Sequence, residues 1–436
     1  MSKIVAIVGR PNVGKSTLYN RLVGERQAII DNVSGVTRDR IYGTCEWNGK
    51  SFTVVDTGGF VKNSDDLFEA AIRVQVEIAI EEAAVIIFLT DVTTGITDLD
   101  EEVANFLRRA DKPVVLGVNK VDNSTREISA NEFWSLGFDE TFFLSSITGS
   151  GTGELLDAVA EKLPENEEEE DEDELPRLAI IGQPNVGKSS LTNALLGEDR
   201  NIVTDIAGTT RDSIHSYYNK FGKEFMLIDT AGIRKKSKVH EDLEFYSVMR
   251  AVRAIEESDI CILMIDAQTG VESQDMNLLG LVHKRRKGLV IVVNKWDLIK
   301  DKETNTAKEF TEKIKRKIAP FKDIPILFVS VLEKQRIFQV IEAALKVYEN
   351  RQQKIRTSEL NNLLLEQIER NPPPANRGRI IKIKYVTQLP LKHPAFAFFC
   401  NHPKHIKANY KGFLENLLRK HFDFTGTPIS IVFKEK

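Results

Sequence analysis

The chain has 436 residues, 42% of them hydrophobic and 28% charged, which is ordinary for a soluble globular protein and too long for one compact core. No apolar run has the length of a membrane span or a secretion signal, and the three cysteines lack metal-ligand spacing, so we expect a cytoplasmic protein with no membrane span. The net charge of −4 is uneven: from Arg351 onward there are 16 Lys+Arg against 6 Asp+Glu. This basic part predicts either an anionic partner or a solvated charged face.

Continuous apolar runs in the first third of the chain are typical of strands in a parallel sheet that is covered on both faces. The predicted strands are Ile4–Val8, Phe52–Val55, Val85–Leu89 and Val114–Val118. Three of them lead directly into polar motifs, namely GRPNVGKS from Gly9, DTGG from Asp56 and NKVD from Asn119. Because open α/β sheets bind ligands at the carboxyl ends of their strands, these motifs are expected to lie together.

The same order of strands and motifs returns later in the chain. The corresponding strands are Leu178–Ile181, Phe225–Ile228, Ile260–Ile265 and Leu289–Val293. GQPNVGKS starts at Gly182, so the two phosphate loops lie 182 − 9 = 173 residues apart. Thr37 and Thr210, in GVTRD and GTTRD, have the same offset. This duplication predicts two GTP-binding domains.

The motif G-x-x-x-x-G-K-[ST] binds phosphates through successive backbone N–H groups at a helix N-terminus. Lys15 and Lys188 are expected at the β- and γ-phosphates. Hydroxyls of the loops, carboxylates of the DTGG and DTAG motifs, and the two switch threonines are expected to hold Mg²⁺. These predicted ligands are Ser16, Thr37, Asp56, Ser189, Thr210 and Asp229.

The NKxD motifs select the base. An aspartate offers two acceptors to N1–H and the amino group of guanine, a donor pair that adenine lacks, so Asp122 and Asp297 indicate GTP over ATP. Ser145-Ser146 and Ser330-Val331 are expected to approach guanine O6 through backbone N–H groups. The predicted GTP-binding residues of the first repeat are Gly9, Arg10, Pro11, Asn12, Val13, Gly14, Lys15, Ser16, Asp56, Thr57, Gly58, Gly59, Phe60, Asn119, Lys120, Val121 and Asp122. Those of the second are Gly182, Gln183, Pro184, Asn185, Val186, Gly187, Lys188, Ser189, Asp229, Thr230, Ala231, Gly232, Ile233, Asn294, Lys295, Trp296 and Asp297.

One residue that many GTPases use in hydrolysis is missing from both repeats. Many GTPases place a glutamine after DxxG to orient the attacking water, but here Phe60 and Ile233 stand in that position. Asn12 and Asn185 could coordinate a monovalent cation against the phosphates, or could simply suit the turn. The predicted catalytic residues are Lys15, Lys188, Asn12, Asn185, Thr37 and Thr210.

Two segments lie outside the repeats. The acidic stretch between Pro164 and Pro176 predicts a solvated spacer, with a binding or regulatory element as the alternative. After it and the second repeat, the elements change to a small α-β-β-α-β pattern. Its predicted elements are a helix at Ser358–Asn371, a strand at Arg379–Thr387 with Ile381, Ile383 and Tyr385 on one face, a strand at Phe396–Cys400, a helix at Lys407–His421 and a strand at Ile429–Phe433.

Tandem GxPNVGKS domains, DTGGF, DTAGIRKK and a C-terminal YVTQ, NHP and GTPISIVF resemble the Der (EngA) family of bacterial ribosome-assembly GTPases over essentially the whole chain. The resemblance implies two tandem P-loop GTPase domains, each α/β with a mostly parallel sheet and helices on both faces, and a small α+β KH-like domain. It also implies action on the large ribosomal subunit and its rRNA, and K⁺ bound through Asn12 and Asn185. The usual GxxG of KH domains is absent.

We therefore expect a monomeric GTP-hydrolysing switch in which two G domains rearrange around a KH-like module. The predicted segments are a first GTPase domain at 1–163, a linker at 164–175, a second GTPase domain at 176–350 and a KH-like domain at 351–436. A scaffold that scarcely hydrolyses GTP is one alternative. Another is a tRNA-modifying GTPase, although no segment supplies the extra domain that it would need.

Overall fold

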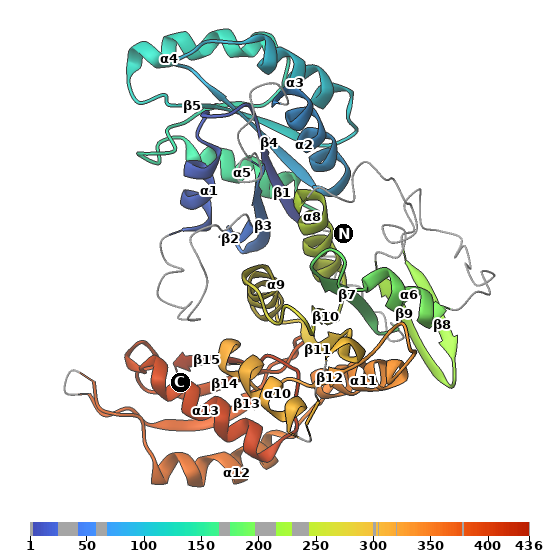
Figure 1. Cartoon of the computed structure of the whole chain (residues 1–436). Coiled ribbons are helices and arrows are strands. Elements are labelled where there is room, and N and C mark those ends of the chain that lie inside the picture. The colour runs from blue at the N-terminus through green and yellow to red at the C-terminus, as the bar shows by residue number, and fades with distance from the viewer. Residues whose placement is uncertain are drawn as a thin grey trace. The chain divides into compact units, whose positions relative to one another are not determined.

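The computed structural model describes residues 3–24, 42–57, 68–164, 175–196, 215–228, 244–299, 302–303, 305–319, 321–376 and 379–435. The chain divides into two compact units, whose elements are labelled in Figure 1. Unit 1 comprises Met1–Glu174 and Lys235–Glu257, and unit 2 comprises Leu175–Arg234 and Ser258–Lys436. This division is coarser than the four predicted segments, whose boundaries remain predictions.

Unit 1 contains a six-stranded sheet in the order β2-β3-β1-β4-β5-β6. The strands are β1 (Ile4–Val8), β2 (Tyr42–Trp47), β3 (Lys50–Asp56), β4 (Val85–Asp91), β5 (Val114–Asn119) and β6 (Thr141–Phe143). All neighbours are parallel except β2 and β3, so the sheet is mostly parallel as predicted. Every residue of β1 and β4 is buried, which explains their continuous apolar sequence.

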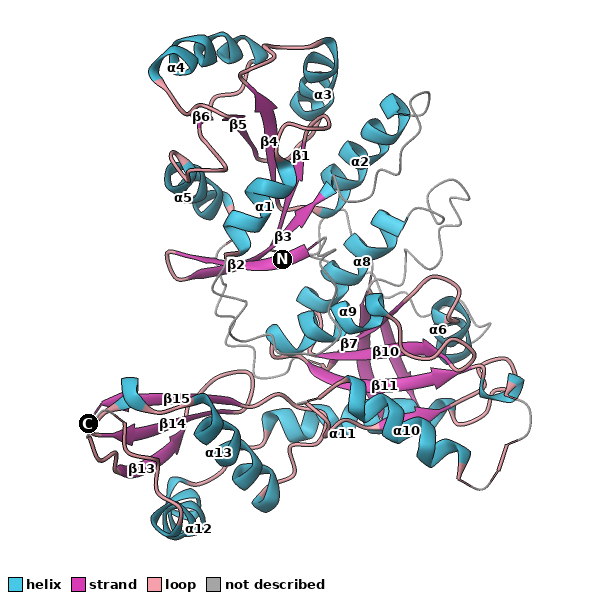
Figure 2. Ribbon diagram, turned by 60° about the vertical axis from the view of Figure 1, so that its left-hand side comes forward, coloured by secondary structure: helices cyan, strands magenta, loops and turns pink. Residues whose placement is uncertain are grey.

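Helices cover both faces of this sheet (Figure 2). They are α1 (Lys15–Val23), α2 (Phe68–Glu82), α3 (Asp98–Arg109), α4 (Ser124–Ala130), the 3₁₀ helix η4 (Asn131–Leu136) and α5 (Thr152–Lys162). Leu18 of α1 and Val159 of α5 pack with Val54 and Val85 in one fully buried core. Unit 1 also includes α8 (Glu244–Glu257), which contacts α2 through an ion pair between Arg253 and Glu82.

Unit 2 repeats the architecture with a sheet in the order β12-β11-β10-β7-β9-β8. The strands are β7 (Arg177–Gly182), β8 (Ser216–Lys220), β9 (Lys223–Ile228), β10 (Ile260–Asp266), β11 (Gly288–Asn294) and β12 (Ile326–Phe328). The helices are α6 (Lys188–Leu196), α9 (Ser273–Lys284), the 3₁₀ helix η5 (Trp296–Leu298), α10 (Thr306–Lys317) and α11 (Ile337–Gln352). The eight strands predicted in the two repeats are confirmed to within two residues.

The C-terminal elements of unit 2 form a three-stranded sheet, β13-β14-β15, with two helices on one face (Figure 2). They are α12 (Thr357–Arg370), β13 (Ile383–Gln388), β14 (Ala395–Cys400), the 3₁₀ helix η6 (Pro403–His405), α13 (Ala408–His421) and β15 (Ser430–Glu435). Leu364 and Leu414, from the two helices, pack against Phe396 and Phe398 of the sheet. The predicted α-β-β-α-β order is confirmed.

One detail of this sheet was predicted wrongly. The strand begins at Ile383 and not at Arg379, and its register shifts between Ile383 and Tyr385. Ile383 pairs with Cys400 while Tyr385 pairs with Phe399. Because Cys400 and Phe399 are consecutive residues of β14, Ile383 and Tyr385 lie on opposite faces. The bulge inserts one residue, which strict alternation cannot foresee.

A turn after α13 joins the C-terminal sheet to the second G domain. Gly426 donates its N–H to Asp323 O, and its carbonyl accepts from the N–H of Leu289 on β11, each at 2.8 Å. The φ of Gly426 is 76°, and a Cβ here would lie 2.4 Å from a methyl group of Val347. Glycine therefore permits this close contact within unit 2.

Across the residues that the structure describes, none of the helices combines the length and apolar character that crossing a membrane would require.

Candidate nucleotide-binding sites

Each phosphate loop follows the first strand of its repeat and ends at a helix N-terminus. In the first loop, between β1 and α1, Gly9 has φ 148° and Gly14 has φ 99°. A Cβ on Gly9 would lie 2.2 Å from Leu89 O, and one on Gly14 would lie 2.3 Å from Asn119 Nδ2. Only glycine fits at these two positions, because the loop is pressed against the ends of β4 and β5.

The second loop reproduces these constraints between β7 and α6. Gly182 has φ 142° and Gly187 has φ 102°. A Cβ on them would lie 2.4 Å from Met264 O and 2.3 Å from Asn294 Nδ2, respectively. The two loops therefore share a backbone shape that exposes N–H groups at a helix N-terminus, the arrangement that binds anions.

The lysines of both loops are held by main-chain carbonyls. Lys15 Nζ donates to Gly9 O and Arg10 O at 2.7 and 2.8 Å, and Lys188 Nζ donates to Gly182 O and Gln183 O at 2.8 and 2.6 Å. Burial lowers the pKa of each ammonium to about 8. A phosphate at the loop would offset this desolvation, so the site favours an anionic ligand.

Two of the three predicted magnesium ligands of the first repeat, Ser16 and Asp56, are in contact. Ser16 Oγ donates to Asp56 Oδ2 at 2.5 Å, and Asp56 is buried at the end of β3. A hydroxyl beside a carboxylate is the hard oxygen donor set that Mg²⁺ prefers, and Mg²⁺ usually takes few protein ligands together with substrate phosphates. The described residues include no group of three or more His, Cys, Asp or Glu that could hold a metal ion.

The asparagine of NKxD joins three motifs in each repeat. Asn119 Nδ2 donates to Val13 O of the phosphate loop at 2.7 Å, while its Oδ1 accepts from Ser146 N at 2.9 Å. In the second repeat Asn294 bonds Val186 O at 2.8 Å and Val331 N at 3.1 Å. The backbone N–H groups of Ser146 and Val331 are thus bonded to asparagine, and their approach to guanine O6 remains a prediction.

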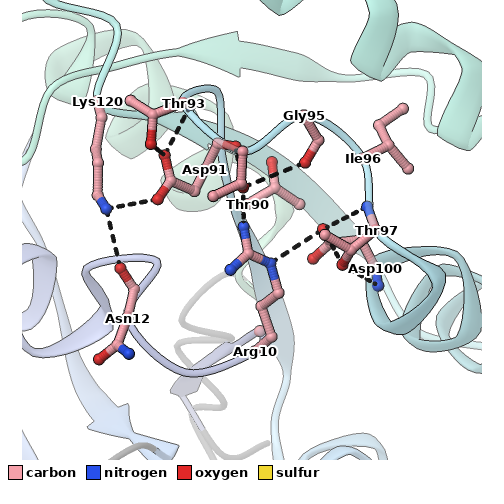
Figure 3. A network of polar contacts seen from close by, with 12 residues as sticks. Arg10, Asn12, Thr90, Asp91, Thr93, Gly95, Ile96, Thr97, Asp100 and Lys120 are labelled. Carbon is pink, nitrogen blue, oxygen red and sulfur yellow. Dashed lines mark hydrogen bonds and ion pairs between the residues drawn. The ribbon is translucent and has the colours of Figure 1, made fainter.

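The lysine of NKxD contacts the phosphate loop, as Figure 3 shows for the first repeat. Lys120 has φ 66° and donates to Asn12 O at 3.1 Å and to Asp91, the last residue of β4. Burial alone would raise the pKa of Asp91, but hydrogen bonds from Lys120 and Thr93 lower it. In the second repeat Lys295 pairs with Asp266 at 2.6 Å.

The second residue of each phosphate loop contacts a buried aspartate, and here the repeats differ. Arg10 Nε donates to Asp100 Oδ2 at 3.2 Å (Figure 3). Arg10 also bonds the hydroxyl of Thr94. Asp100 closes a capping box with Thr97 at the start of α3. The second repeat instead has a neutral contact, from Gln183 Nε2 to Asp275 Oδ2 at 3.1 Å.

Without a cationic partner in the hydrogen bond, the second buried aspartate has a perturbed pKa. Burial raises the pKa of Asp275 to about 6, although Glu272 N and Gln183 donate hydrogen bonds to it. Asp275 belongs to a capping box with Glu272 at the start of α9. The two nucleotide sites therefore share their motifs but differ in the charge that supports the loop.

The predicted base-selecting residues lie at the ends of β5 and β11. Asp122 accepts from Arg126 Nη1 at 2.6 Å and from Asn123 Nδ2 at 2.9 Å, at the start of α4. In the second repeat Asp297 lies in η5, beside Trp296. The Trp296 ring contacts that of Phe328 with centroids 4.4 Å apart, which packs this turn against β12.

Both loop asparagines have left-handed backbones, with φ 64° at Asn12 and 61° at Asn185. Asparagine tolerates this region better than most residues, so the turn itself is one sufficient reason for both. The potassium role of their side chains remains a prediction.

Several predicted residues lie outside the described part of the chain. They are Thr37, Gly58, Gly59, Phe60, Thr210, Asp229, Thr230, Ala231, Gly232 and Ile233. Among the remaining ones, Thr57 donates to Ile7 O at 2.9 Å and the N–H of Val121 bonds Leu144 O at 3.0 Å. Pro11 is half-buried and Pro184 is exposed.

Sequence reasoning missed four aspartates that hold these sites together. Asp91 and Asp266 end the strands β4 and β10, and both pair with the NKxD lysines. Asp100 and Asp275 lie behind the phosphate loops. Their common signal is position: each pair is separated by 175 residues, as the NKxD motifs are (266 − 91 = 275 − 100 = 294 − 119), and Thr97-x-x-Asp100 has the spacing of a capping box.

Comparisons with known proteins agree with this geometry. A family model described as a 50S ribosome-binding GTPase matches residues 4–120 and again residues 177–295. A second model, described as the KH-domain-like C-terminal region of EngA bacterial GTPase enzymes, matches residues 354–434. The matches cover both phosphate loops, both NKxD asparagines and the C-terminal sheet.

Curated relatives match over the full length. GTPase Der of Christiangramia forsetii is 62% identical over 436 residues, and GTPase Der of Flavobacterium johnsoniae is 58% identical over 436 residues, with 100% of each chain covered. Among solved structures, Aquifex aeolicus Era bound to GDP and AlF4- is 31% identical, covering 44% of this chain and 66% of that chain, with a TM-score of 0.31. A TM-score this low carries no argument about the chain as a whole.

Proposed function

The chain belongs to the GTPase Der family, binds GTP or GDP and hydrolyses GTP, and we propose that it acts in biogenesis of the large ribosomal subunit. The observation that carries this proposal is the match of both repeats to a family described as 50S ribosome-binding GTPases. The KH-like C-terminal region, with its excess of Lys and Arg, supplies a basic surface for rRNA. Nucleotide exchange would rearrange the two G domains around this module.

Co-sedimentation with purified ribosomal subunits tests this proposal. Pelleting with the large subunit in a non-hydrolysable GTP analogue, but not in GDP, is expected. A Lys15→Ala, Lys188→Ala double variant serves as the control, because it lacks the phosphate-loop ammonium in both sites. Absence of binding in either nucleotide at moderate salt would sink the ribosomal role while leaving the GTPase activity intact. A cytoplasmic location and a monomeric state belong to the same proposal, and light scattering after gel filtration checks the latter.

The site roles are also proposals, supported by the contacts described above. Backbone N–H groups of the two loops would bind the β-phosphate, and the buried ammonium groups of Lys15 and Lys188 would neutralise its charge and that of the γ-phosphate. Asp122 and Asp297 would select guanine. Asn119 and its counterpart would hold the loop at a fixed distance from the base-binding motif, because their amides bond both.

Members of GTPase families generally use Mg²⁺, and the residues of the first repeat fit it. Ser16 and Asp56 would hold the ion, together with Thr37 while the γ-phosphate is present; Ser189, Asp229 and Thr210 are the counterparts. When bound, the ion neutralises phosphate charge in the transition state. The protein's contribution would be positioning: Asp56 would fix the Ser16 hydroxyl, and the loop carbonyl that accepts from Lys15 would hold its ammonium near the phosphates.

Glycine substitutions can separate a role of the Asn12 and Asn185 side chains in binding potassium from their role in forming the turn. Asn12→Gly and Asn185→Gly keep a residue that adopts positive φ without strain and remove only the side-chain amide. If the amides help to bind K⁺, GTP turnover should exceed that in Na⁺ for the wild type and become equal in the two salts for the glycine variants. Equal turnover in both salts for the wild type would reject the potassium role.

The alternatives differ in whether GTP is hydrolysed and in what the C-terminal region does. The full-length relatives are named GTPases, which disfavours a scaffold that scarcely hydrolyses GTP, and the C-terminal region matches the KH-domain-like model of EngA GTPases. Phe60 and Ile233 cannot orient water, so turnover should be slow in the isolated protein and faster with the ribosomal partner. Single-turnover hydrolysis with and without large subunits measures this difference.

A further inference from the structure

The open face of the C-terminal sheet carries an aromatic pair that the nucleotide sites do not use. Tyr385 of β13 and Phe399 of β14 stack with ring centroids 4.3 Å apart and planes 10° from parallel. Both are partly exposed, whereas Phe396 and Phe398 are fully buried on the face that α12 and α13 cover. Large aromatic rings left at a surface are a feature of binding sites.

The bulge in β13 places Tyr385 on this face. Ile383 pairs with Cys400 and packs against the core, and the register then shifts so that Tyr385 pairs with Phe399. Without the shift, Tyr385 would lie on the covered face with Ile383. Bulges often re-aim a side chain beside a functional site, and this one creates the stacked pair.

Lysines surround the pair. Lys434 of β15 is in register with Phe399, so it lies on the same face, and it is exposed. Lys384 occupies the bulge and is exposed as well. The acidic neighbour Glu435 pairs with Cys400 and therefore lies on the opposite face. Val432, 41% exposed, extends the apolar surface along β15.

This combination fits unpaired nucleotides. Bases stack on aromatic rings, and lysines neutralise the adjacent phosphates, whereas a duplex keeps its base faces stacked and out of reach. The GxxG loop with which KH domains clamp nucleotides is absent from the sequence after Arg351, so another surface must supply that contact. We propose that Tyr385 and Phe399, flanked by Lys384 and Lys434, bind single-stranded RNA. The inference rests on the proposed function, in which the partner is ribosomal RNA.

Fluorescence anisotropy with the full chain tests the surface. The probe is a labelled single-stranded RNA of about 12 nucleotides in mixed sequence, within the site sizes of single-strand binders, and its duplex serves as comparison. Tyr385→Ala and Phe399→Ala should each weaken binding about 5- to 160-fold, since one stacked base contributes about 1–3 kcal/mol. Tyr385→Phe should bind like the wild type. Each of Lys384→Gln and Lys434→Gln should reduce the slope of log K against log salt by about 0.7.

A matched control comes from a different exposed aromatic pair. Phe221 and Phe338 contact each other in the second G domain with centroids 5.0 Å apart, and both are more than half exposed. Phe338→Ala should leave RNA affinity unchanged. Should the alanine variants at the sheet unfold, Tyr385→Leu and Phe399→Leu retain apolar packing while removing the ring, and the comparison is made with them.

The outcomes separate this inference from the proposed function. Unchanged single-strand affinity in the Tyr385 and Phe399 variants overturns the inference, as does wild-type binding to the duplex as tight as to the single strand. If these variants lose co-sedimentation with the large subunit but keep oligonucleotide affinity, the face binds protein, and the inference fails while the function stands. If the variants lose oligonucleotide affinity but the wild type never pelleted with ribosomal subunits, the RNA surface stands and the ribosomal role fails.

Discussion

The lowered pKa of the phosphate-loop lysines predicts that nucleotide binding takes up protons on the alkaline side of neutrality. Burial sets the pKa of Lys15 at about 8 in the nucleotide-free site, so about nine-tenths of the molecules carry the ammonium at pH 7 and about a quarter at pH 8.5. A bound phosphate restores a higher pKa, so only the charged form binds well. The dissociation constant for GDP should therefore be about 4-fold larger at pH 8.5 than at pH 7.

Calorimetry of GDP binding in buffers of different ionisation enthalpy measures both quantities. We expect uptake of about 0.1 proton per site at pH 7 and about 0.8 at pH 8.5. An Asp297→Asn background weakens guanine binding at the second site, so that the first is observed alone. Asp275, with its pKa of about 6, is about nine-tenths ionised at pH 7 and almost fully ionised at pH 8.5, and it lies behind the loop of the second site, so it does not contribute to proton uptake at the first.

Lys15→Met in the same background is the matched control. It should bind GDP more weakly at both pH values and lose the proton uptake, because the only group removed is the ammonium. Deprotonation of guanine itself affects the variant and the parent equally. Proton uptake that persists in Lys15→Met, or its absence from the parent, would refute the assignment of the pH dependence to this lysine.

Three further predictions follow from single contacts. Lys15→Ala or Lys188→Ala should weaken GDP binding at its own site and leave the other site unchanged, and equal weakening of both sites by one change would refute independent sites. Asp275→Asn removes a carboxylate whose raised pKa destabilises the fold above pH 6 and less so below it. The unfolding temperature should therefore rise at pH 7.5, equivalent to an increase of up to about 3 kcal/mol in the free energy of unfolding, and about half of that increase is expected at pH 5. Asp100→Asn breaks the ion pair with Arg10 and should lower the unfolding temperature. Gly426→Ala should destabilise unit 2 in urea by about 1–3 kcal/mol because of its positive φ, whereas Gly412→Ala, with nothing near its Cβ in α13, should stabilise by up to about 1 kcal/mol.

The hydrophobic pattern was sufficient to predict the strands, because burial on both faces of the sheet requires an unbroken apolar run. Residues of β1, β4 and β11 are buried throughout, so their sequences are unbroken apolar runs, and the motifs that follow them mark the sheet edge. The glycines of the phosphate loops are equally predictable from the sequence motif. Their positive φ and their contacts with Leu89 O and Met264 O leave no space for a side chain. Local sequence decides these features.

The rest depends on contacts between distant residues. The bulge at Tyr385 arises from pairing with β14, and no local pattern in β13 distinguishes it from regular alternation. Asp91 and Asp100 are ordinary acidic residues in sequence, and only the fold brings them to Lys120 and Arg10. Residues of this kind become visible when both repeats are compared at the same offset.

The two repeats share one set of motifs but differ in the contact that supports the phosphate loop. Arg10 gives the first loop a charged link to Asp100, whereas Gln183 gives the second a neutral link to Asp275. Asp275, with its pKa of about 6, can gain a proton under mildly acidic conditions. Since Asp275 also raises the pKa of Lys188, its protonation would withdraw that support from the ammonium. The second site should therefore respond to mild acid through Asp275, whose hydrogen-bond partner Gln183 is the one residue that differs between GRPNVGKS and GQPNVGKS.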